Sequence, residues 1–240
     1  MKIIADTHCH TVASVHAYST MLENIKIANE KGLWAIAFTD HSGAIPDAPG
    51  NWYFENLKIL PKKIDGVRVL RGIESNVLGA NGEIDLPDLK NPLDWVIASI
   101  HDVTWNGKHG LKECTDAWLN VAKNSYVNVI GHSGLDDFKY DYEKVIPIFK
   151  ENNKLIEINS SSFRVRKGSY KNCLQIAKIC KQYNANVVVS SDAHISDYVG
   201  RFDEAIDLLK FIDFPEELVI NSSVDKFENY LRNNSIFFKS

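Results

Sequence analysis

The sequence has few cysteines, no cluster of positive charge and no long apolar run, and each scarcity argues against a class of protein. Its 240 residues include four scattered cysteines without a CxxC pair, so we expect neither a disulfide framework nor a cysteine-bound zinc. No stretch approaches the ~20 apolar residues that span a membrane, and the N-terminus MKIIADTHCH lacks the apolar core of a signal peptide. We therefore expect a cytoplasmic protein without a membrane partner.

The charge balance argues against a nucleic-acid partner. Lys and Arg number 27 and Asp and Glu number 31, which gives a net charge of −4 and a pI of about 6.1. Nucleic-acid-binding surfaces need clustered Lys and Arg, and no such run is present. The hydrophobic fraction of 45% is that of a globular chain with a sizeable core. A small molecule is the expected partner, and formation of a homo-oligomer stays open.

Short apolar runs alternate with helical patterns along the whole chain. Strands are predicted at 2–8, 34–41, 67–75, 94–101, 127–133, 155–161 and 186–194. Helices are predicted at 20–31, in part of 54–64, and at 113–124, 141–152, 169–183, 202–212 and 225–233. Near-continuous apolar strands separated by helices are typical of an α/β fold with a parallel sheet. We see loops at 42–54 and 79–92 but no linker, and we expect one domain over residues 1–240.

Most of the histidines stand where the predicted strands end. Three of the eight fall within HCHTVASVH near the N-terminus, where His16 lies in the loop just beyond the strand, and only His109 lies elsewhere, in WNGKHG. In a parallel barrel the carboxyl ends of the strands converge on one face, where active sites form. An open sheet would spread seven strand ends too far apart for one cluster. The candidate ligands therefore favour a closed or distorted barrel; they are His8, His10, His16, His41, Glu74, His101, His132, Asp192 and His194.

The residue types and their spacing indicate a metal centre. Side chains at i and i+2 of a strand share a face, so His8 and His10 project together, as do Asp192 and His194. Imidazole and carboxylate bind Zn²⁺ and related divalent ions. A lone histidine at a strand end is more often an ordinary polar residue, but seven in such places indicate a shared role. Nine ligands, with Glu74 bridging, suit two or three ions.

Other residues are candidates for supporting roles. A ligating histidine usually donates its second N–H to a carboxylate or carbonyl, and Asp6, Asp40 and Asp102 lie beside ligands or two residues away. Alternatively, these aspartates cap the ends of strands or are solvated charges in loops. Arg166 and Lys167 follow the sixth strand and could bind phosphate, with Arg164 and Arg201 as weaker candidates. The loop aromatics Trp52, Tyr53 and Trp105 either stack on a leaving group or, as we favour, are buried under a loop.

The motifs DTHCHT, FTDH, RGIES, SIHD, IGHSG and SSDAH resemble those of the PHP (polymerase and histidinol phosphatase) family. ASVHAYST, RKGS and DFPEEL are closer to its stand-alone YcdX-type phosphatases. The resemblance covers nearly the whole chain and implies a distorted (β/α)7 TIM-like barrel with three divalent ions, usually zinc, with manganese or iron in relatives. It implies three ligand sets: His8, His10, Glu74 and Asp192; Glu74, His101 and His132; and His16, His41 and His194. One departure is Ser133, where proline commonly follows the histidine.

A centre of this kind suits phosphate-ester hydrolysis. Three divalent ions and two carboxylates leave about four positive charges, which attract oxyanions, and a metal-bound water with a pKa near ~7 supplies a nucleophile. We therefore predict a metal-dependent phosphomonoesterase for small molecules, with Glu74, Asp192 and His194 as its catalytic residues. The alternatives are a phosphodiesterase or nuclease and a non-catalytic metal-binding domain. The sequence names neither the substrate nor the native metal.

Overall fold

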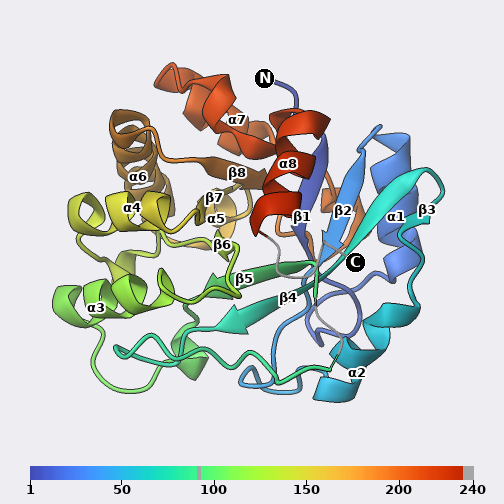
Figure 1. Cartoon of the computed structure of the whole chain (residues 1–240), viewed down its shortest axis with the longest axis horizontal. Helices are drawn as coiled ribbons and strands as arrows, with labels where there is room; N and C mark the ends of the chain where they lie inside the picture. The colour runs from blue at the N-terminus through green and yellow to red at the C-terminus, as the bar shows by residue number, and fades with distance from the viewer. Residues whose placement is uncertain (91–92, 235–240) are drawn as a thin grey trace.

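The computed structural model describes residues 1–90 and 93–234, and its centre is a parallel sheet that curls into a barrel (Figure 1). Hydrogen-bonded neighbours follow the order β1, β2, β4, β5, β6, β7, β8. Their bounds are β1 Ala5–Cys9, β2 Ala35–Phe38, β4 Val67–Asn76, β5 Trp95–Ser99, β6 Val129–Ile130, β7 Leu155–Asn159 and β8 Val187–Ser190. The predicted distorted (β/α)7 barrel is confirmed. A short strand that we did not predict, β3 Lys63–Ile64, pairs antiparallel with β4.

The first and last strands of the barrel meet through only a few hydrogen bonds. At their carboxyl ends Cys9 and Ala193 form an isolated parallel bridge, in which the His10 N–H donates to the Ala193 carbonyl at 2.8 Å. Further down, the amide of Asn221 fills the gap and donates to the carbonyls of Ala5 and Val189 at 2.9 and 2.7 Å. The barrel is therefore closed directly at the end where the predicted ligands lie.

The helices pack around the barrel, and all except α5, which was not predicted, lie near their predicted positions. They are α1 Met21–Glu30, α2 Asn51–Asn56, α3 Leu111–Val121, α4 Tyr142–Glu151, α5 Ser162–Val165, α6 Ser169–Tyr183, α7 Asp203–Phe211 and α8 Val224–Asn234. The local sequence determines where some helices begin. For example, Thr20 and Glu23 form a capping box at the start of α1. The loop prediction for 42–54 was wrong at its end, where α2 begins. Residues 91–92 of the predicted loop 79–92 lie outside the described residues.

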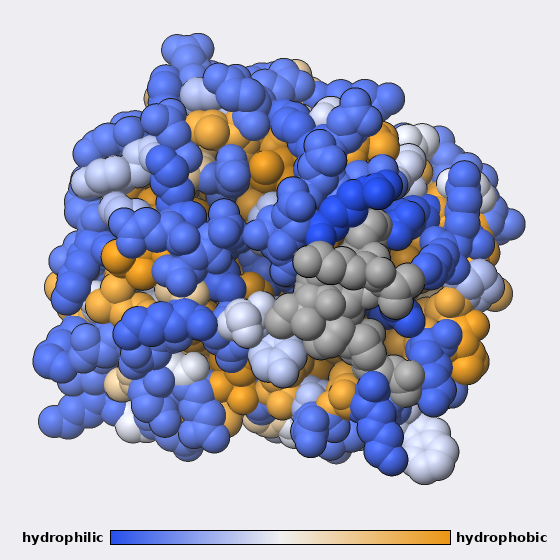
Figure 2. All heavy atoms as spheres, in the orientation of Figure 1, coloured by the Kyte–Doolittle hydropathy of each residue, from blue (hydrophilic) through white to orange (hydrophobic). Residues whose placement is uncertain are grey.

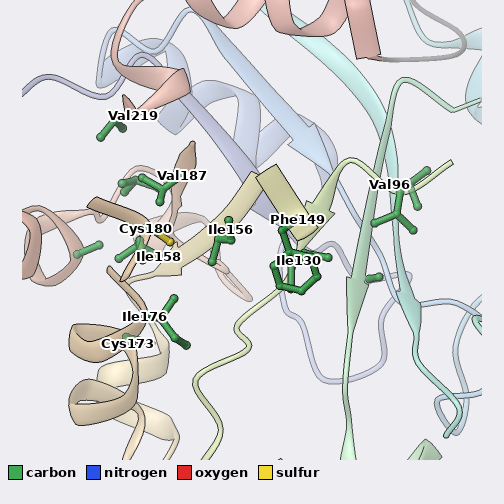
Figure 3. Close-up of a cluster of buried hydrophobic side chains, with 14 of the residues drawn as sticks. Val96, Ile130, Phe149, Ile156, Ile158, Cys173, Ile176, Cys180, Val187 and Val219 are labelled. Atoms are coloured by element: carbon green, nitrogen blue, oxygen red, sulfur yellow. The ribbon is translucent and has the colours of Figure 1, made fainter. Parts of the chain in front are cut away.

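Alternation along the strands creates two cores. Outward side chains such as Ile156, Ile158 and Val187 pack against Ile176 and Cys180 of α6 (Figure 3). Inward side chains form a second core with α8, which covers the amino-terminal mouth of the barrel. There the ring of Phe227 packs edge-on against Trp95, with centroids 5.5 Å apart. One mouth is thus sealed by apolar side chains, and the other is left for polar ones.

The surface and the barrel interior agree with this division. Hydrophilic side chains cover most of the face seen in Figure 2, and apolar atoms show in separate patches. Among the described residues, no helix is long and apolar enough to cross a membrane. Inside the barrel, a Cβ on Gly131 would lie 2.1 Å from Ser99 Oγ, so only glycine fits immediately before His132.

Candidate metal centre

Glu74 stands at the centre of the cluster formed by the nine predicted ligands. It projects from β4 and is 1% exposed. Five histidine nitrogens lie within 3.6 Å of its carboxylate oxygens: Oε2 faces His41 Nδ1 at 3.0 Å, His8 Nε2 at 3.3 Å and His10 Nε2 at 3.4 Å, while Oε1 faces His132 Nε2 at 2.9 Å and His101 Nε2 at 3.6 Å. The two carboxylate oxygens of Glu74 therefore face two different groups of imidazoles.

Asp192 and two further histidines complete the cluster on its outer side. Asp192 Oδ1 lies 3.4 Å from His10 Nε2 and 3.6 Å from His194 Nδ1. His16, on the exposed rim, places its Nε2 3.2 Å from His41 Nε2. The ring centroids of His16 and His194 are 4.8 Å apart. All nine residues that the sequence singles out are thus brought together, from the ends of six strands and one loop.

The donor set fits divalent metal ions. Three groups have donor atoms within 4.8 Å of one another: His8, His10 and Glu74; His41, Glu74 and His101; and His10, His41 and His194. The buried Nδ1 of His41 has no hydrogen-bond partner among the described residues, although it points at the Glu74 carboxylate. Imidazoles converging on shared carboxylates form the N/O environment that zinc, manganese and iron bind.

Electrostatics favour the protonation states that metals require at some of these groups. At His8, by contrast, burial alone would lower the pKa, but the carboxylates of Glu74, Glu157 and Asp192 outweigh burial and raise the pKa well above its usual value. Burial alone would raise the pKa of Glu74, but His8, His41 and His101 lower it well below its usual range. Burial, and then the neighbouring His41 and His194, lowers the pKa of His10 well below its usual value. Glu74 is therefore a carboxylate and His10 a neutral imidazole at neutral pH, the forms in which both can bind a metal.

Two of the candidate ligands have left-handed backbone. The φ angles are +23° at His132 and +53° at Asp192, a conformation that costs a non-glycine residue roughly 1–3 kcal/mol. The expectation that Asp192 and His194 project from a strand is wrong, because β8 ends at Ser190. A left-handed turn, not strand alternation, brings Asp192 to the cluster.

Sequence reasoning missed the residues that hold the ligands. Glu157 of β7 is fully buried; its Oε1 lies 2.7 Å from His8 Nδ1, and its Oε2 accepts from the His132 N–H at 2.6 Å. Asn76 Oδ1 accepts from His101 Nδ1 at 2.7 Å. The available signal was a lone carboxylate inside the apolar run LIEIN, because a buried charge requires partners.

The predicted supporting aspartates behave differently from one another. Asp6 accepts from Ser191 Oγ and the Gly200 N–H, at 2.5 and 2.7 Å, and so ties β1 to the segment after β8. Asp102 is exposed at the cavity rim. Only Asp40 reaches a candidate ligand, and it does so through a serine hydroxyl.

A cavity of about 500 Å³ opens above the cluster. Arg166 lines it and places Nη1 3.1 Å from Asp192 Oδ2. Its apolar wall includes Ile45, Val103 and Leu135. Lys167 is exposed and does not line this cavity, so its predicted contact with substrate stays a prediction.

The weaker candidates lie away from the cavity. Arg164 pairs with Glu204, and Arg201 lies 3.9 Å from the same carboxylate. Trp52 is 86% exposed, and Trp105 packs against Phe138 with ring centroids 5.5 Å apart. The favoured prediction, that these aromatic side chains are covered by a loop, agrees with the packing of Trp105 and is wrong for Trp52.

The family profile of the PHP domain matches residues 6–234. The chain belongs to the PHP domain family. A protein named "probable phosphatase" from Thermoanaerobacter sp. (strain X514) is 47% identical over 234 residues, which cover 97% of this chain and 96% of the relative. A second probable phosphatase, from Caldanaerobacter subterraneus subsp. tengcongensis, is 48% identical and shares 97% of this chain and 92% of its own length.

A solved PHP structure has the same fold. It is the histidinol phosphate phosphatase of Lactococcus lactis in complex with zinc, L-histidinol and phosphate. The TM-score is 0.65 with 19% identity, over 90% of this chain and 95% of the other. At this identity the likeness concerns the barrel, and the ligand set of this chain is argued from its own residues.

Proposed function

We propose that this protein hydrolyses phosphate monoesters of small molecules at a centre of three divalent metal ions. The observation that carries the proposal is the arrangement around Glu74: a buried carboxylate ringed by five imidazoles at the base of an open cavity. The enzyme class, a hydrolase acting on phosphoric ester bonds, is confirmed by the full-length phosphatase relatives. The substrate class and the number of ions are our inference.

The geometry suggests how the ligands are shared. Because its two oxygens face different imidazoles, Glu74 is suited to bridge two ions. The sets are those that the family resemblance implies: His8, His10, Glu74 and Asp192; Glu74, His101 and His132; and His16, His41 and His194. Zn²⁺ is the expected ion, with Mn²⁺ or Fe²⁺ as alternatives for the same ligands. Ions held by these residues would supply a water of lowered pKa and would offset the charge of the phosphate.

The remaining roles belong to side chains at the cavity wall. Arg166 is the one positive side chain that lines the cavity within the described part of the chain, and we assign it to a phosphate oxygen. Its guanidinium is held by Asp192 and by Ser162 Oγ, each at 3.1 Å. Glu74, Asp192 and His194 are the residues that we assign to the catalytic step, because Glu74 is the carboxylate at the centre of the cluster and Asp192 and His194 line the cavity above it.

The rim of the cavity favours a small monoester over nucleic acid. Two carboxylates, Asp102 and Asp137, line it beside apolar residues such as Val103 and Leu135. A phosphodiester backbone binds through several Lys or Arg contacts, and among residues 1–90 and 93–234 this rim provides only Arg166. The phosphodiesterase or nuclease alternative is therefore ranked second.

Two measurements test the proposal together. Metal content is measured by elemental mass spectrometry on protein purified without chelator, and turnover is measured on p-nitrophenyl phosphate, bis(p-nitrophenyl) phosphate and single-stranded DNA. We expect near three ions per chain and faster hydrolysis of the monoester, with both lost after chelation. Faster diester or DNA cleavage would establish the nuclease alternative. Bound metal without hydrolysis of any ester would point to a non-catalytic metal-binding domain.

A further inference from the structure

We propose that Tyr53 is a positioning residue that acts through Asp40 and Ser14 to hold His10 in a single tautomer, with Nε2 free to bind a metal. Tyr53 lies on α2, outside the cluster of candidate ligands, and no ligand motif includes it. The link to metal binding rests on the proposed function. The direction in which each hydrogen bond is donated follows from the positions of the Tyr53, Asp40 and Ser14 side chains alone.

Asp40 is the fixed point of this chain of contacts. It is 1% exposed and follows β2. Its Oδ1 accepts from the Thr11 N–H at 2.8 Å and Ser14 Oγ at 2.7 Å, and its Oδ2 accepts from Thr11 Oγ1 at 2.8 Å and the Tyr53 hydroxyl at 2.6 Å. Each oxygen thus receives two donors, which fills the main acceptor sites of a carboxylate.

The single proton of the Ser14 hydroxyl decides the next step. Since that proton is donated to Asp40, the Ser14 oxygen can only accept from its other neighbours. These are the His41 N–H at 3.2 Å and His10 Nδ1 at 3.4 Å. His10 must then carry its proton on Nδ1, because a serine oxygen without a free proton has nothing to donate.

The other nitrogen of His10 is consequently left with its lone pair. His10 Nε2 faces Glu74 Oε2 and Asp192 Oδ1, each at 3.4 Å, and His8 Nε2 at 3.1 Å, which is the donor in this contact when His10 Nε2 carries no proton. Only an unprotonated nitrogen can bind a metal. A ligating histidine is commonly held by a hydrogen bond from its second nitrogen, and here that bond leads outward through Ser14 and Asp40 to Tyr53.

Tyr53 also connects the ligand to the cavity wall. The loop before α2 contributes Ile45 to that wall, and the Tyr53 hydroxyl joins this part of the chain to the turn after β1 through Asp40. Loss of the hydroxyl would leave Asp40 with three donors. Asp40 and Ser14 could then rotate, and His10 would sample both tautomers.

The test reads the tautomer of His10 directly, in metal-free protein, from long-range ¹H–¹⁵N correlations. We expect the Nδ1-protonated form in the wild type and a mixture in Tyr53→Phe and Ser14→Ala. We also expect zinc affinity, measured by chelator competition, to fall about tenfold or more in both variants. Tyr170→Phe, at an exposed tyrosine on α6, is the matched control and should change neither readout.

Two outcomes would overturn the proposal: an Nε2-protonated His10 in the wild type, or wild-type tautomer and zinc affinity in Tyr53→Phe. Thermal melting of each variant separates a folding defect from a change at His10. The tautomer readout needs no turnover. A chain that shows the expected tautomers but hydrolyses no ester would disprove the proposed function and leave the role of Tyr53 intact.

Discussion

His8 Nδ1 lies 2.7 Å from Glu157 Oε1, and both side chains are fully buried inside the barrel. The contact fixes the imidazole so that its Nε2 faces Glu74. We expect Glu157→Gln to lower zinc affinity by about 10–100-fold, because it removes the charge that orients His8. Chelator competition measures the change. Glu151→Gln, at an exposed position on α4, is the control, and equal affinity in both variants would contradict this role.

Glu74 and His109 give a paired test of the ligand assignment. Glu74→Gln keeps the shape of the side chain but removes the charge shared by five imidazoles. It should release metal and lower kcat/KM by more than about 100-fold, as loss of a central electrostatic group does. His109 bonds the Asp137 carbonyl outside the cluster, so His109→Ala should retain the wild-type number of ions. Metal loss in His109→Ala would show that the ligand assignment is wrong.

Arg166 should matter more than its neighbour Lys167. Its guanidinium faces the cavity, whereas Lys167 is exposed. A charged hydrogen bond contributes about 1.5–3 kcal/mol, so Arg166→Ala should reduce kcat/KM for p-nitrophenyl phosphate by roughly 10–150-fold. Lys167→Ala is the comparison, measured at the same metal loading. An equal loss of kcat/KM in both variants would show that Lys167 also contacts the substrate.

Lys154 predicts a pH dependence of stability. Its ammonium donates to the Asn124 and Val127 carbonyls at 2.6 and 2.7 Å, and burial lowers its pKa from 10.5 to about 8. Between these values the unfolded chain binds more protons than the folded one, so the free energy of unfolding rises with pH across this window. Urea unfolding of the wild type and Lys154→Met should show this rise only in the wild type. Parallel pH profiles would contradict the lowered pKa.

Phe227 tests the separation between stability and chemistry. It closes the barrel mouth opposite the cluster and packs on Trp95. Phe227→Ala should cost about 3–5 kcal/mol of unfolding free energy while metal content at low temperature stays at the wild-type value. Denaturant unfolding and elemental analysis check the two parts. Loss of metal from a folded variant would mean that α8 also shapes the site.

The sequence alone was sufficient for the barrel and for the nine residues of the cluster. Near-continuous apolar strands must be covered on both faces, here by the surrounding helices and by the core inside the barrel, and ligands at strand ends can converge only if those strands close. Local periodicity and residue type therefore determined α6, which matches its predicted bounds, and the convergence of His8, His41 and His101.

The tertiary structure alone decided which groups orient the ligands. The sequence offered Asp6, Asp40 and Asp102 because they are near histidines along the chain, and of these only Asp40 reaches a ligand, through Ser14. The contacts made instead by Glu157 and Asn76 join residues 149 and 25 positions apart, and no local pattern reports them. The left-handed turn at Asp192 and the proton order from Tyr53 to His10 are of the same kind. They depend on which strands and loops become neighbours when the barrel closes, because hydrogen bonds act over a few ångströms in space and not along the chain.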